Sequence, residues 1–523
     1  MRRILLAGLI AALAAPAMAQ NVTLATTANP TLDPHFNFFT NNIAVWRHFT
    51  TTLTMQDPDK GMMPNLAVSW SAPDERTWEF QLNPAAKFRD GTPVTADDVV
   101  FSLARVPSIP GNPSPYTPLL QGIGSFEATG PHTLRIHTST AAPDVPFNLG
   151  GIGVLSRRAV EGKTSSDINN RSALLESGPY TVENFVQGDR IVLKRNPGWF
   201  GGAVPWEQVT IRFITNDASR VAALLAGDVD FIDFVPPSDA PRLRDNPKLA
   251  VWDGPSNRLM MLYPNMQPGP VAEIADADGK PLAVNPLRDL RVRQALSKAI
   301  DRAALVERIM DGAGVATAQY GIPGMIGYDP TIATDKADPQ GARALLAAAG
   351  YPSGFTLTVN CSNNRYPNDD KVCQALGQML TRAGFRAKVE TMPVATLLPM
   401  MKGTQEAGSK SALGMLGLSS SSSFPITLPI SIQTADPATG RGAYNFSRYS
   451  NSAVDADINA AYAALDPVQR EARTRAAQTA AMAELPVLPL FFLKVLTAGR
   501  ADLTYRTNIY EETSALNLRP APR

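Results

Sequence analysis

The sequence contains few of the residues from which catalytic and metal sites are usually built. Its 523 residues include only two cysteines and four histidines, His35, His48, His132 and His137. These histidines form no Ser/His or Cys/His arrangement along the chain, and G-x-S-x-G, S-x-x-K and H-E-x-x-H do not occur. The segment Gly162–Thr164 lacks the earlier glycine of a phosphate-binding loop. We therefore expect neither an enzyme nor a metal or cofactor site.

An excess of charge of one sign is also missing. The chain has 48 Lys and Arg against 47 Asp and Glu, which gives a net charge of +1. A protein that binds nucleic acid needs a basic stripe to neutralise phosphates, and no run of Lys or Arg supplies one. We therefore expect no nucleic-acid partner.

Long apolar runs are absent except near the start of the chain. Arg2 and Arg3 precede an apolar run from Ile4 to Ala15, and Ala17–Ala19 supplies an A-x-A cleavage site. This arrangement is typical of a signal peptide over residues 1–19, and the run is too short to anchor the chain in a bilayer. No cysteine follows for lipid attachment. The sequence predicts an exported periplasmic protein, and its remaining roughly 500 residues predict two or more lobes.

Residues 64–106 predict a strand, a turn and a capped helix in succession. Apolar and polar side chains alternate over Thr77–Leu82, as in a half-buried strand. Asp90, Gly91 and Pro93 supply turn residues. Thr95 is a suitable helix N-cap, and an apolar stripe at helical spacing follows it.

The amino-acid sequence of this region closely resembles the signature of the family 5 extracellular solute-binding proteins. These are the oligopeptide, dipeptide and nickel class of receptors for ABC importers. The resemblance is carried by LAxSW, DExxWEFxL and KFRDGTPVTADDVVFS, and a second signature, DLRVRQALSKAIDRxxL, begins at Asp289. It implies an α/β fold with two lobes, that is, a type II periplasmic-binding-protein fold of the large cluster with an extra subdomain. Mixed sheets would be joined by hinge strands.

The resemblance also implies a domain plan and a function. The expected parts are a signal peptide (1–19), lobe I (20–262, with an inserted subdomain at about 45–180), lobe II (263–487) and a return to lobe I (488–523). The chain would be a monomeric receptor that closes on a small molecule or peptide and delivers it to an ABC permease and ATPase complex at the inner membrane. A secreted hydrolase or a periplasmic chaperone built on the same fold is the alternative. Nickel is disfavoured because lobe II has no histidine.

The first loop of this fold lies under the ligand in the family, which singles out Phe38, Phe39 and Asn41 as cleft residues; a place in the core is the alternative for the aromatics. In dipeptide-binding relatives an arginine before a long helix of the second lobe holds the ligand carboxylate. Arg365 is the corresponding residue, and its guanidinium suits that task. The alternative is an exposed loop arginine.

The sequence departs from the peptide binders where they carry an acidic D-x-P-D-P-like segment that pairs with the peptide amino terminus. Here the chain reads Ser421, Ser422, Ser423 and Phe424, and no carboxylate occurs between Glu406 and Asp436. Recognition of an α-amino group in the usual way is therefore in doubt. The serines suit neutral or anionic groups, or they belong to a flexible polyserine loop.

Cys361 follows a predicted strand, and Cys373 lies in a predicted helix over Asp369–Ala383. In an exported protein, two cysteines alone favour a disulfide between them, and the spacing fits neither a CxxC redox site nor a metal site. The segment Leu287–Ile309 predicts two helices, the first capped by Asp289 and the second beginning at Asp301. In the first helix we expect Arg291 and Arg293 to lie on the solvated or salt-bridging surface.

Overall fold

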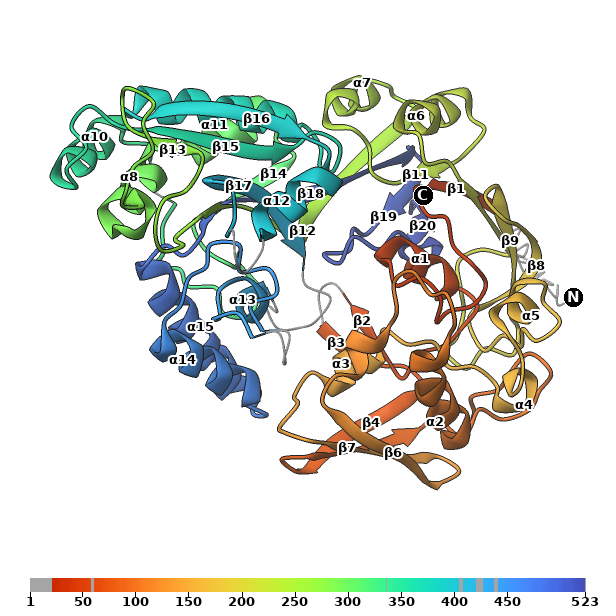
Figure 1. Cartoon of the computed structure of the whole chain (residues 1–523). Helices are drawn as coiled ribbons and strands as arrows, with labels where there is room; N and C mark the ends of the chain where they lie inside the picture. Colours follow the sequence, from red (N-terminus) through yellow and green to blue (C-terminus); the bar gives the residue numbers. More distant parts are fainter. Residues whose placement is uncertain are drawn as a thin grey trace, which may run out of the picture.

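The computed structural model describes residues 21–57, 61–334, 336–403, 408–419, 427–436 and 441–522 (Figure 1). The expected signal peptide, residues 1–19, lies outside this set, as do Ser421 to Phe424. Among the described residues, no helix combines the length and the apolar character that crossing a membrane requires.

A twelve-stranded mixed sheet runs through the molecule. Ten of its strands follow one another in the order β13 (Ile274–Ala275), β15 (Thr356–Ser362), β17 (Leu413–Ser419), β12 (Leu249–Pro264), β18 (Leu488–Arg500), β11 (Phe231–Ile232), β1 (Asn21–Thr26), β10 (Gln208–Phe213), β9 (Arg190–Arg195) and β8 (Tyr180–Val186). β14 (Gly314–Ala316) pairs with β18, and β16 (Arg386–Met392) pairs with β15. Parallel pairs such as β1 with β10 and antiparallel pairs such as β12 with β18 make the sheet mixed, as expected.

The longer helices are α2 (Ala96–Arg105), α6 (Asp217–Ala226), α8 (Leu290–Ala299), α10 (Pro339–Ala348), α11 (Asp369–Arg382), α12 (Val394–Lys402), α14 (Ser452–Ala463) and α15 (Pro467–Ala483). The shorter ones are α1 (Thr40–Trp46), α3 (Val145–Leu149), α4 (Arg157–Val160), α5 (Ser165–Asn169), α7 (Ala240–Arg244), α9 (Arg302–Ala304) and α13 (Thr427–Ser431). Two hairpins, β2 (Thr54–Asp57) with β3 (Gly61–Pro64) and β19 (Leu503–Tyr505) with β20 (Leu518–Pro520), stand apart from the main sheet.

The buried side chains form two hydrophobic cores. The first core gathers residues between 22 and 213 together with Phe231 and residues 503–518. The second core gathers Ala25 and residues between 221 and 498. Burial of apolar area is the main stabilising contribution to folding, so each core is a centre of stability in its half of the protein. In Figure 1 most of the red-to-yellow elements surround the first core, together with the blue strands β19 and β20. The yellow-green helices α6 and α7 and most of the green-to-blue elements surround the second core.

The strands β12 and β18 connect the two cores. β12 pairs with β17 over residues 258–264 on the second-core side, and its partner β18 reaches β11 through Ala498 and Gly499. The ladder between β12 and β18 is interrupted, because Pro255 faces Lys494 and the next paired position, Leu259, faces Phe492. Such a bulge bends a strand locally. The pair has the position expected of hinge strands.

A four-stranded antiparallel sheet, in the order β4 (Ala67–Asp74), β5 (Thr77–Leu82), β7 (Thr133–Thr138) and β6 (Ile123–Gly130), forms a separate layer in the first half. β5 and α2 confirm the predicted strand and helix. Thr95 and Asp98 form a capping box at the start of α2, in which the Thr95 amide and hydroxyl both donate to the Asp98 carboxylate at 2.9 and 2.8 Å.

The two arginines of α8 have different environments. Arg291 is exposed and pairs with Asp289, the N-cap residue of the helix. Arg293 is buried and donates to the main-chain oxygens of Glu484, Leu287 and Arg288 at 2.8–2.9 Å. The prediction of a solvated position was wrong for Arg293, because these carbonyl groups satisfy its donors inside the protein.

A buried ion pair joins the two halves away from the hinge strands. Asp144, the N-cap residue of α3, accepts a hydrogen bond from Arg470 of α15, and both side chains are almost fully buried. α3 contributes Val145 to the first core, and α15 contributes Ala477 to the second. The contact therefore connects elements that are coloured orange and blue in Figure 1.

Candidate ligand-binding site

A cavity of about 940 Å³ lies between the two cores. One wall comes from the loop after β1 and the start of α1, including residues 27–29, 37 and 39–42. The opposite wall comes from residues 363–370, between β15 and α11. The middle of β18, Leu493–Leu496, also lines the cavity, next to the interrupted ladder. A volume of this size is typical of sites for small molecules.

The three residues that the sequence singles out in the first loop occupy different places. Phe39, the N-cap residue of α1, lines the cavity, and its side chain is 56% exposed. Asn41 also lines the cavity and donates to the Thr27 hydroxyl at 2.5 Å. Phe38 packs on the first core instead, with its ring centroid 4.7 Å from that of Tyr116.

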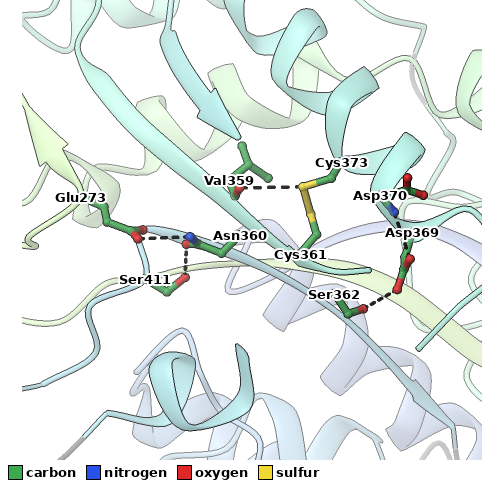
Figure 2. Close-up of a disulfide and its surroundings, with 9 residues drawn as sticks. All are labelled: Glu273, Val359, Asn360, Cys361, Ser362, Asp369, Asp370, Cys373 and Ser411. Atoms are coloured by element: carbon green, nitrogen blue, oxygen red, sulfur yellow. Dashed lines mark hydrogen bonds between the residues drawn. A yellow bond between two sulfur atoms is a disulfide. The ribbon is translucent and has the colours of Figure 1, made fainter. Parts of the chain in front are cut away.

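The disulfide lies directly under the opposite wall. Cys361 at the end of β15 and Cys373 in α11 are bonded, with their Cα atoms 6.1 Å apart, which confirms the predicted pairing (Figure 2). Both residues are fully buried in the second core. The bridge therefore fixes the two elements from which the loop 363–368 emerges.

The carboxylate of Asp369 organises the loop itself. It accepts hydrogen bonds from the Ser362 hydroxyl at 2.7 Å and from the main-chain N–H groups of Arg365 and Tyr366 at 3.1 and 3.2 Å (Figure 2 shows the bond with Ser362). Asn368 precedes the helix with φ of 54°, in the left-handed region that asparagine tolerates. The loop is thus held at both ends and from within.

Arg365 is exposed on this loop and lines the cavity. Its guanidinium carbon lies 5.7 Å from the ring centroid of Tyr366, and it forms no ion pair with any residue of the described ranges. Tyr366 is itself fixed, since its hydroxyl donates to the Gly417 oxygen at 2.8 Å and accepts from the Gly417 amide at 3.1 Å. The Arg365 guanidinium is therefore available to bind an anionic group, and the neighbouring Tyr366 is held in place by its hydrogen bonds with Gly417.

The sequence did not point to two other cations of the lining, and both have partners. Arg258 of β12 donates to the Glu511 carboxylate at 3.1 and 2.6 Å. Burial lowers the pKa of Arg258 and the adjacent carboxylate raises it, and the net shift is upward. Lys494 of β18 pairs with Asp253 at 3.2 Å. Arg258 and its partner Glu511 are 253 residues apart in the chain, so no local sequence motif predicts the pair.

A polar network lies beside the disulfide, on the side away from the loop (Figure 2). Glu273 accepts hydrogen bonds from the Asn360 amide at 3.1 Å and from the Ala412 main-chain amide at 2.8 Å, and Asn360 accepts one from the Ser411 hydroxyl at 2.7 Å. Burial raises the pKa of Glu273 to about 7, although both hydrogen bonds favour its ionised form.

The two histidines near the first wall make structural contacts. The His35 ring bonds to the Gly153 oxygen at 2.7 Å, and the His48 ring bonds to Val45 and Ala515 main-chain groups. Burial lowers the pKa of both rings to about 4. Within the part of the chain that the structure describes, no three His, Cys, Asp or Glu side chains gather as a metal site would require.

Two cores, two shared strands and a cavity between them define the class: a two-part binding protein for small solutes. The chain matches the bacterial extracellular solute-binding proteins, family 5 Middle, over residues 61–427, and it belongs to this family. Its members are binding proteins, so this chain is a binding protein and not an enzyme. The resemblance seen in the sequence is confirmed.

The chain is similar to the glutathione-binding protein GsiB of Salmonella typhi, with 29% identity over 512 residues that cover 95% of this chain and 94% of the relative. It also resembles the unliganded open form of the periplasmic murein tripeptide binding protein MppA (TM-score 0.80, 22% identity, 96% and 98% coverage). HbpA2 from Haemophilus parasuis gives a TM-score of 0.82 at 20% identity, with 96% and 100% coverage. The expected periplasmic-binding-protein fold is confirmed.

Proposed function

We propose that this protein is the periplasmic receptor of an ABC importer and that it binds a small peptide-like or other organic solute with an anionic group. The observation that carries the proposal is the position of Arg365. Arg365 lines a cavity of about 940 Å³ and has no ion-pair partner among the described residues. A guanidinium on a fixed loop is suited to a carboxylate, which it can bind through two parallel hydrogen bonds.

Closure of two lobes is the proposed mechanism. The lobes are residues 20–262 with 488–523, and residues 263–487, and β12 and β18 connect them. A solute that touches both walls binds the closed form better than the open form, and it shifts the population by that difference in affinity. Phe39 and Asn41 are the contacts proposed for the first wall, and Arg365 is the contact proposed for the second. The segment Ser421–Phe424 stays a prediction.

Export through a signal peptide over residues 1–19 would place the receptor in the periplasm as a monomer, where the closed form would meet a permease and ATPase complex. Glutathione is a reasonable first probe, because GsiB is described as a glutathione-binding protein. The molecule carries two carboxylates and an ammonium group, so it can offer a carboxylate to Arg365. A chaperone of the same fold would instead bind unfolded chains without one saturable site.

Calorimetry with glutathione and mass spectrometry of co-purified solutes test the proposal. We expect one saturable site for an anionic, peptide-like solute. Arg365→Ala should weaken it by about 1.5–3 kcal/mol, the usual contribution of a charged hydrogen bond. Arg308→Ala is the matched control, because Arg308 is exposed on the second-core side and does not line the cavity. Equal affinity in the wild type and Arg365→Ala would exclude the assigned role of Arg365.

A further inference from the structure

From the charges of the cavity we infer that Asp370 binds an ammonium group of the solute, so that the site selects zwitterions with a free amino group. The inference rests on the proposed function and deepens it. Asp370 is the second residue of α11 and lines the cavity (Figure 2 shows it beside Asp369). A carboxylate in the lining is the group that an ammonium of the solute requires as its counter-ion.

The other acidic side chains of the described lining are already engaged. Asp217 pairs with Arg220 at 2.8 Å, and Glu511 pairs with Arg258. The Asp369 carboxylate holds the loop 362–366 through three hydrogen bonds. Asp370 differs from them: it is exposed, and within the described ranges its carboxylate has no hydrogen bond or ion pair with the protein.

The basic residues of the cavity lining also divide into those that have a carboxylate partner and one that has none among the described residues. Arg258 and Lys494 have carboxylate partners, and Arg365 has none among the described residues. Arg365 and Asp370 do not pair with each other either, although both belong to the segment that joins β15 to α11. The wall therefore offers one positive and one negative group at the same time, on a support that the disulfide and Asp369 hold in place.

Burial of an unpaired ammonium group in a closed cavity is strongly unfavourable, so the affinity of the protein for a solute with such a group depends on a counter-ion in the cavity. A zwitterion could satisfy Arg365 with its carboxylate and Asp370 with its ammonium, while its side chains face the wall of Phe39. Both charges of the solute would then be bound by the second half of the protein before closure. A capped compound would leave Asp370 without a partner in the closed form.

Equilibrium dialysis with mass-spectrometric detection tests this inference. The probes are glutathione and dialanine, each with its N-acetylated derivative. The wild type should bind at least one free-amine probe about 10- to 150-fold more tightly than the acetylated form, as for a charged hydrogen bond. Asp370→Asn should reduce this ratio to near one, and Asp278→Asn, which changes an exposed carboxylate outside the cavity, should leave it unchanged.

The outcomes separate the two proposals. Preference for the acetylated forms, equal binding of both forms, or an unchanged ratio in Asp370→Asn would refute the role of Asp370 and leave the receptor for a peptide-like solute standing. Absence of binding for all four probes would count against both the inference and the peptide-like class. Circular dichroism of Asp370→Asn should match the wild type, since the side chain is exposed.

Discussion

Removal of the disulfide should destabilise the second core selectively. The bridge closes a loop with a sequence separation of 12 residues. The chain-entropy relation gives a stabilisation of about 3 kcal/mol for a loop of this length, mainly through the unfolded state. For the proposed second lobe, residues 263–487, that free energy corresponds to a fall of about 6–12 °C in the melting temperature. The perturbation is the double variant Cys361→Ala with Cys373→Ala.

The distribution of tryptophan provides the assay. Trp46 and Trp206 lie in the first core, and the remaining four, Trp70, Trp78, Trp199 and Trp252, pack against it. Both cysteines lie in the second core. Tryptophan fluorescence therefore follows the first half, whereas far-ultraviolet circular dichroism follows both. We expect the double variant to show an earlier transition by circular dichroism, with a smaller change by fluorescence.

Reduced wild-type protein is the control for the loss of side-chain volume, because it lacks the bridge and keeps both cysteines. The double variant and the reduced protein should melt at similar temperatures, both below the oxidised protein. An oxidised protein that melts no higher than either of them would refute the stabilising role of the bridge. A change confined to fluorescence would refute its assignment to the second core.

Two further predictions concern a buried carboxyl and an ion pair. Because burial raises the pKa of Glu273 from its ordinary value of 4.5 to about 7, the folded protein holds this proton more tightly than the unfolded chain does. The contribution of Glu273 to the free energy of unfolding should therefore be complete below pH 4.5 and should fall as the pH rises to about 7. The free energies of unfolding in urea of the wild type and of Glu273→Gln should diverge over this pH range. Parallel pH profiles of the two proteins would contradict this prediction. Asp144→Asn removes the charge that pairs with Arg470 across the two halves, and small-angle scattering of the ligand-free protein should show a larger radius of gyration. An identical scattering curve would rule out that connecting role.

Local structure and family signatures were predictable from the sequence because short-range rules decide them. Alternation gave β5, and the spacing of Thr95 and Asp98 anticipated the start of α2. The pairing of Cys361 with Cys373 followed from the count of cysteines and the export signal. These features depend on residues that are close in the chain or on composition.

The environment of single side chains was less predictable, because tertiary packing decides it. Phe38 and Phe39 are adjacent, yet one packs on Tyr116 and the other lines the cavity. Arg293 was predicted to lie on a solvated helix face, but its guanidinium is buried and donates a hydrogen bond to the main-chain oxygen of Glu484. The availability of Asp370 emerges only when every other carboxylate of the lining has been matched to its partner.

The interrupted ladder between β12 and β18 also has a mechanical consequence. Residues 256–258 of β12 stand opposite Leu493 of β18, so three residues face one at the floor of the cavity. The irregularity leaves these residues outside the β12–β18 ladder, and a second register shift follows between Met260 and Met261. If the two lobes close as proposed, we expect the bend to fall at this point, because few hydrogen bonds between β12 and β18 would have to change there.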